Sequence, residues 1–174
     1  MPAARFVDQL NAQIGNELAA HNQYLACAVY YDALTMPRLA AFFYEQALEE
    51  RGHAMMMVQY LLDTDADVVM PGVDAPVAAF DDLVAPVSLA LDQEKRVTEQ
   101  VNGLLRIARD EYDFASEQFM QWFIKEQVEE VATMSDLLAV VTRSAHDIEA
   151  IEEYVAREQG DVGSDATAPR IAGA

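Results

Sequence analysis

A carboxylate and an imidazole stand three positions apart in the run Glu49-Glu50-Arg51-Gly52-His53. Residues three apart on a helix share one face, so Glu50 and His53 can hold one metal ion between them. The same face carries apolar residues at steps of three, four and seven: Phe43, Ala47, Ala54, Met57 and Leu61. An ionised carboxylate buried among such residues is costly without a partner. Glu50 therefore needs a cation, a proton or a hydrogen-bond network.

Helical periodicity runs through most of the 174 residues and predicts an all-α fold. Five helices are expected, over about Arg5–Ala33, Arg38–Leu62, Asp82–Ala108, Phe114–Arg143 and Asp147–Glu158. The short turn that ends at Pro37 makes the first two helices antiparallel neighbours. Residues 1–158 are predicted to form one domain. Residues 159–174, rich in Gly, Ala, Ser and Asp, are predicted to form a flexible C-terminal tail.

The segment 65–81 joins the second and third helices and contains the helix breakers Pro71-Gly72 and Pro76. Extended, it reaches on the order of 55 Å, whereas a helix of about 27 residues is roughly 40 Å long. The segment can therefore cross the whole bundle. The third helix, with Asp81 or Asp82 as its N-cap, then runs parallel to the second. The expected architecture is a four-helix bundle with one long crossover plus a short fifth helix.

Each long helix carries one glutamate in its apolar stripe, close to the midpoint of the helix. These residues are Glu17, Glu50, Glu94 and Glu130. In a bundle of helices of similar length the midpoints share one level, so we expect the four carboxylates to meet in one layer with His53. Tyr24 lies about two turns from Glu17 on the same face and could donate a hydrogen bond or an electron there. A flanking site is also possible, because one segment of the fourth helix spreads over roughly 160° of its circumference: Glu126, Gln127, Glu129 and Glu130.

The charge balance favours cations as partners, and the ligand types favour Fe(II) or Mn. The 30 acidic and 11 basic residues give a formal net charge of −19, which argues against nucleic acid or a membrane surface as a partner. Carboxylates with one imidazole suit Fe(II) or Mn better than a structural zinc site. Two irons about 3.5–4 Å apart can together give two electrons to dioxygen. The single cysteine, Cys27, fits a reducing cytoplasm, and we expect neither a signal peptide nor a membrane anchor.

The combined pattern resembles the ferroxidase centre of prokaryotic non-haem ferritins, on a ferritin-like bundle. It comprises Glu17, Tyr24, Glu49-Glu50-x-x-His53, Glu94 and Glu126-Gln127-x-Glu129-Glu130. The resemblance implies iron storage: oxidation of Fe(II) by O2 or H2O2 at a di-iron centre, with deposition of ferric mineral inside a homo-oligomeric 24-subunit shell. It implies that Tyr24, Glu50, Glu94 and Glu130 act in the oxidation.

The resemblance also implies how the ligands are shared. Glu17, Glu50 and His53 hold the first iron. Glu50, Glu94 and Glu130 hold the second, with Gln127 close to it. An additional iron site is implied at Glu49, Glu126, Glu129 and Glu130, and Trp122 matches a tryptophan that is thought to donate electrons.

Two departures from the family pattern have consequences. The haem-binding branch has a methionine directly after the bridging glutamate, where this chain has Arg51, and a histidine on helix four where this chain has Glu130. We therefore expect no haem. At the pore where animal ferritins have two acidic residues, this chain has Glu117 and Met120, which leaves Asp113 and Glu117 as weak candidates for iron entry.

Two other functions remain open. One is a rubrerythrin-like di-iron peroxidase or oxidase without storage, although the chain lacks a second E-x-x-H and a Cys-x-x-Cys module. The other is an acidic bundle that binds cations or a partner protein without catalysis. Particle size separates them from a storage shell.

Outside the glutamate set, packing roles are favoured for His21, Cys27 and Met55–Met57, and packing competes evenly with electron transfer for Trp122.

Overall fold

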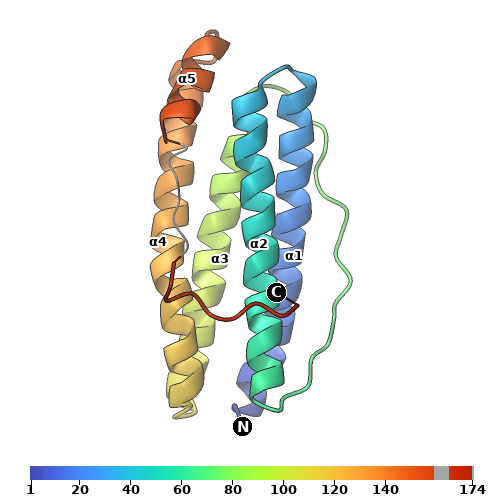
Figure 1. Cartoon of the computed structure of the whole chain (residues 1–174), viewed down its shortest axis with the longest axis vertical. Helices are drawn as coiled ribbons and strands as arrows, with labels where there is room; N and C mark the ends of the chain where they lie inside the picture. Colours follow the sequence, from blue (N-terminus) through green and yellow to red (C-terminus); the bar gives the residue numbers. More distant parts are fainter. Residues whose placement is uncertain (159–164, 174) are drawn as a thin grey trace.

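The computed structural model describes residues 1–158 and 165–173, so 159–164 and 174 of the predicted tail lie outside the described residues. Its helices are α1 (Ala4–Ala33), α2 (Pro37–Asp63), α3 (Ala85–Asp110), α4 (Phe114–Arg143) and α5 (Ile148–Glu158), and the described residues contain no strand (Figure 1). The predicted all-α fold is confirmed. No helix among the described residues is both long enough and apolar enough to cross a membrane.

The helix starts follow from capping chemistry. Asp113 is the N-cap of α4, and its side chain accepts hydrogen bonds from the Ser116 backbone nitrogen and hydroxyl at 3.1 and 2.6 Å. The prediction that Asp81 or Asp82 is the N-cap of α3 is wrong. Asp82 instead forms a turn just before the helix. Its Oδ1 accepts from the nitrogens of Val84 and Ala85 at 2.8 Å, in a turn before the helix, and Val84 is the N-cap because Pro86 sits in the first turn.

The crossover between α2 and α3 runs along the length of the bundle, as predicted, and lies beside α1 (Figure 1). Side chains of α1 hold it at three levels. The amide of Asn11 bonds to the backbone of Asp67 and Val69, the amide of Gln23 bonds twice to Val77, and the Tyr31 hydroxyl donates to the Leu83 carbonyl at 2.7 Å. An extended segment that lacks helical hydrogen bonds thereby satisfies part of its backbone.

The helices pair as two antiparallel hairpins. α1 packs mainly on α2, and α3 packs mainly on α4. The turn between α1 and α2 closes through a hydrogen bond from the Met36 nitrogen to the Tyr31 carbonyl at 3.0 Å. α5 packs against α2, where the Glu152 carboxylate accepts from the first-turn backbone nitrogens of Arg38 and Leu39 at 2.8 and 2.9 Å.

The apolar interior forms two separate clusters. One contains Tyr24, Tyr31, Phe43 and Met134, and the other contains Phe6, Ile14, Met57, Leu104 and Phe123. On every long helix the buried glutamate lies between the part that belongs to one cluster and the part that belongs to the other. A polar layer therefore divides the core, at the level where the glutamates were predicted to meet.

Candidate metal centre

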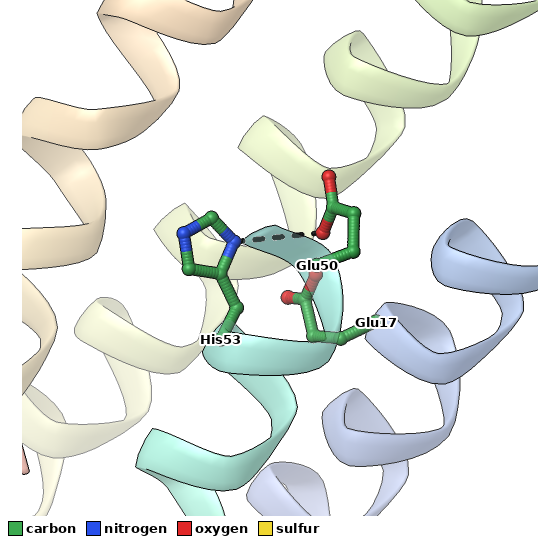
Figure 2. Close-up of side chains that lie close together, drawn as sticks. All are labelled: Glu17, Glu50 and His53. Atoms are coloured by element: carbon green, nitrogen blue, oxygen red, sulfur yellow. Dashed lines mark ion pairs between the residues drawn. The ribbon is translucent and has the colours of Figure 1, made fainter. Parts of the chain in front are cut away.

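The inner cluster of this layer consists of Glu17 from α1 and Glu50 and His53 from α2 (Figure 2). One ligand atom of each lies within 4.8 Å of those of the other two. Their exposed fractions are 1%, 2% and 4%, so solvent screens none of them well. His53 Nδ1 is 3.5 Å from Glu50 Oε2, which follows from their spacing of one helical turn.

Two oxygens of the inner cluster lack hydrogen-bond partners. Glu17 Oε2 and Glu50 Oε2 are buried, and neither accepts a hydrogen bond from any described residue. Buried carboxylate oxygens are normally paired, because leaving an acceptor unpaired costs about 1–3 kcal/mol or more. Two carboxylate oxygens without hydrogen-bond partners beside an imidazole form a donor set that suits a divalent cation. The residues therefore fit a bound iron ion.

The other half of the layer is tied together by hydrogen bonds. The buried Glu94 carboxylate accepts from the Tyr24 hydroxyl and from Gln127 Nε2, the latter at 3.0 Å. Glu130 is 5% exposed and faces the same layer. The structure thus brings Tyr24, Glu94, Gln127 and Glu130 to the level of the inner cluster.

Burial and the charges of neighbouring carboxylates act on the glutamates of this layer. Burial raises the pKa of Glu50, and the carboxylates of Glu17 and Glu94 raise it further. Burial and the nearby Glu49 and Glu94 raise the pKa of Glu130. Burial likewise raises the pKa of Glu94 to about 7, even though the Tyr24 hydroxyl favours its charged form. A cation in the layer would relieve both the desolvation and the repulsion.

An outer cluster shares His53 with the inner one. Ligand atoms of Glu49, His53 and Glu126 lie within 4.8 Å of one another, and Glu49 is held by the Gln46 amide at 2.8 Å. Burial and the charge of Glu49 raise the pKa of Glu126 to about 7. Glu129, the fourth acidic residue predicted here, is exposed and lies 3.6 Å from Lys125 Nζ.

Gln13 was missed in the sequence. It is fully buried, and its Nε2 donates to Glu17 Oε1 at 2.9 Å and to Gln100 Oε1 at 3.1 Å. Its position one turn before Glu17 on the same stripe was the available signal. His21 bonds to the Ala47 carbonyl at 2.6 Å and Cys27 is fully buried, as expected for packing residues.

The metal-free protein is expected to become more stable as the pH falls from about 8 to about 5. A carboxyl whose folded pKa exceeds its unfolded pKa stabilises the fold fully below the unfolded value, and this stability is lost as the pH rises through the folded value. For Glu94 the window runs from about 4.5 to about 7, worth on the order of 3 kcal/mol. Thermal unfolding in chelator checks this. Glu94→Gln should make the melting temperature depend less on pH. An unchanged dependence in that variant would contradict the raised pKa of Glu94.

The four-helix bundle with one long crossover and the buried layer of carboxylates place this protein in a class of helical bundles. Members of this class bind metal ions through inward-facing carboxylates. The profile of the family described as Ferritin-like domain matches residues 7–144. The chain is 51% identical over 169 residues to "Ferritin BfrB" of Mycolicibacterium smegmatis, covering 97% of this chain and 93% of that protein. It is 34% identical over 154 residues to "Bacterial non-heme ferritin" of Staphylococcus aureus, covering 88% and 93%.

A solved structure agrees with these relatives. The open-pore ferritin of the archaeon Archaeoglobus fulgidus superposes with a TM-score of 0.86 at 28% identity, covering 90% of this chain and 97% of that one. The chain belongs to the ferritin family, as predicted, and its general function is iron storage.

Proposed function

We propose that this chain oxidises Fe(II) to Fe(III) at the buried polar layer and stores the product as ferric mineral inside a 24-subunit shell. The observation that carries the proposal is the pair of unpartnered oxygens, Glu17 Oε2 and Glu50 Oε2, buried beside His53. Such a site favours a divalent cation, and two more carboxylates, Glu94 and Glu130, stand in the same layer for a second one.

The residues of the layer would bind two substrate Fe(II) ions. Glu17, Glu50 and His53 would hold one Fe(II). Glu50, Glu94 and Glu130 would hold the other, so that Glu50 is shared. Each Fe(II) supplies one electron, and the pair reduces O2 or H2O2 by two electrons. Gln13 orients Glu17, while Tyr24 and Gln127 orient Glu94 through the hydrogen bonds described above.

An additional iron site is proposed beside this centre. Glu49 and Glu126 already form a cluster with His53, and Glu130 is close enough to both for their charges to raise its pKa. Glu129 would join this additional site by giving up its ion pair with Lys125, which is exposed and therefore weak in water. The net charge of −19 favours an acidic lumen that attracts Fe(II), and we place the shell in the cytoplasm.

Particle size and iron oxidation measured on one sample test the proposal. Anaerobic Fe(II) loading followed by air should give rapid growth of ferric absorbance in a particle of 24 chains of 19.3 kDa. Glu17→Ala should slow the oxidation at least roughly tenfold, since holding a metal depends on each ligand. The matched control Glu99→Ala, on the exposed face of α3, should oxidise iron at the wild-type rate.

Two results would contradict the proposal. Equal rates in wild type and Glu17→Ala would place the oxidation elsewhere. Fast oxidation by a monomer or dimer would indicate a rubrerythrin-like enzyme that stores nothing.

The protein is also expected to bind no haem. Arg51, at the position where the haem-binding branch has methionine, is charged and exposed on α2, and its guanidinium is no ligand for haem iron. Protein purified from haem-supplied cells should therefore have no Soret absorption. One haem per pair of chains in such a preparation would refute the expectation.

A further inference from the structure

Residues 165–173 lie across α4 and α2, at the lower right of α4 in Figure 1. Four polar contacts hold this C-terminal strap, and one of them joins Asp165 Oδ2 to Lys125 Nζ at 3.9 Å. Trp122 Nε1 donates to Asp165 Oδ2 at 3.0 Å, the Ala172 nitrogen donates to the Met55 carbonyl at 3.1 Å, and Arg170 lies 3.4 Å from Asp63. Ala168 and Ala172 also pack against the second apolar cluster. The strap therefore reaches the two helices that supply His53 and Glu126.

Hydrogen bonds within the strap orient the Asp165 carboxylate toward Trp122. Its Oδ1 accepts from the Thr167 nitrogen and hydroxyl at 2.8 and 2.6 Å, which fixes the carboxylate. Its Oδ2 accepts from the indole at 3.0 Å and lies 3.9 Å from Lys125 Nζ. The hydrogen bonds from Thr167 and Trp122 lower the pKa of Asp165 to about 2, so it stays ionised near neutral pH. An ionised acceptor makes a stronger hydrogen bond than a neutral one.

The held indole packs against the metal centre. Its ring lies edge-on to the imidazole of His53 with centroids 5.6 Å apart, and Phe123 packs edge-on to both rings at 5.0 and 5.7 Å. His53 is the one residue common to the inner and outer clusters. The orientation of its ring therefore decides how well it serves Glu17 and Glu50, and Trp122 forms one wall against that ring.

We propose that Asp165 is a positioning residue: it holds Trp122 against His53 and so keeps the imidazole aligned for the inner cluster. This inference rests on the proposed metal centre. The proposal implies that metal binding and docking of the strap are coupled. The docked strap raises the affinity for the metal, and bound metal must favour the docked strap by the same factor.

Trp122 is the only tryptophan in the chain, so tryptophan fluorescence reports on the surroundings of this one indole. In the metal-free full-length protein, Asp165→Ala should raise the acrylamide quenching constant about twofold and reduce the near-ultraviolet circular dichroism of the indole, because the ring gains freedom and solvent. Asp165→Asn, which keeps an oxygen acceptor, should restore most of both signals. Asp92→Ala, an exposed aspartate on α3, is the control and should change neither.

The second readout is the affinity for Zn²⁺, a redox-inert probe, measured by calorimetry. Asp165→Ala should weaken Zn²⁺ binding at the inner cluster by about three- to tenfold, with Asp165→Asn between it and wild type. Zn²⁺ should in turn slow carboxypeptidase digestion of the wild-type C-terminus but not of Asp165→Ala.

Unchanged quenching in Asp165→Ala would overturn the proposal, and so would unchanged Zn²⁺ affinity with increased quenching. Glu50→Ala separates this failure from that of the metal centre itself. If wild type binds Zn²⁺ and Glu50→Ala does not, the centre stands and only the role of Asp165 is at stake. If neither binds Zn²⁺, the proposed centre fails and the inference falls with it.

Discussion

Replacing Glu50 with glutamine is expected to abolish rapid Fe(II) oxidation and to make the metal-free protein more stable. Glu50 is the ligand that both proposed iron positions share. Even residues that only orient a ligand cost roughly 10–100-fold when removed, so the rate should fall by more than about 100-fold. The stability should rise because the amide is neutral, of the same shape, and able to donate to the unpartnered Glu17 Oε2.

The two halves of this prediction are measured separately. Stopped-flow absorbance gives the oxidation rate, and scanning calorimetry in chelator should give a melting temperature about 5 °C higher. Glu45→Gln, the same change at an exposed position of α2, should alter neither quantity. A lower melting temperature in Glu50→Gln would mean that the Glu50 carboxylate has a partner in the metal-free fold.

Replacing Phe43 with alanine is expected to give a large loss of stability. Phe43 is fully buried, stacks on Tyr31 at 5.5 Å and tilts against Tyr24 at 5.8 Å. Removing a buried phenylalanine side chain costs about 3–5 kcal/mol, because it leaves a cavity as well as losing apolar burial. The melting temperature should fall by about 10 °C.

The same change should reach the metal centre through Tyr24, whose hydroxyl bonds to Glu94. Fe(II) oxidation in Phe43→Ala should therefore slow at temperatures where the protein is still folded. Phe43→Leu keeps most of the volume and should cost only about 1 kcal/mol, with oxidation close to wild type. Equal destabilisation by both substitutions would show that volume at this position is not what matters.

Most of the fold could be predicted because its helices are long, strongly periodic and separated by clear breakers. The crossover followed from the helix breakers and the length of the segment, and its extended course along the bundle is confirmed, whereas its position beside α1 was not predicted. The start of α3 was placed too early because Asp82 has the residue type of an N-cap. Its side chain instead closes a turn before the helix.

For the candidate site, periodicity identified which glutamates face inward but not what their oxygens contact. Helical phase fixes the direction of a Cβ atom, and rotamers and neighbours decide the rest. The bond from Gln13 to Glu17 was therefore missed, and Glu129, at the edge of the helix face, lies beside Lys125. The contact from Trp122 to Asp165 could not be predicted, since a segment outside the helices has no period that ties it to α4.

The pairing of the helices into two hairpins has a consequence for motion. Glu17, Glu50 and His53 belong to the hairpin of α1 and α2, whereas Glu94 and Glu130 belong to the hairpin of α3 and α4. With four carboxyl groups crowded at the seam, we expect the metal-free bundle to open most easily between its hairpins, so that amide hydrogens there exchange through a hinge-like opening. The second iron of the proposed centre would be held by Glu50 from one hairpin and by Glu94 and Glu130 from the other. Its binding would join the hairpins, and it should slow exchange even in α1, which supplies none of its ligands.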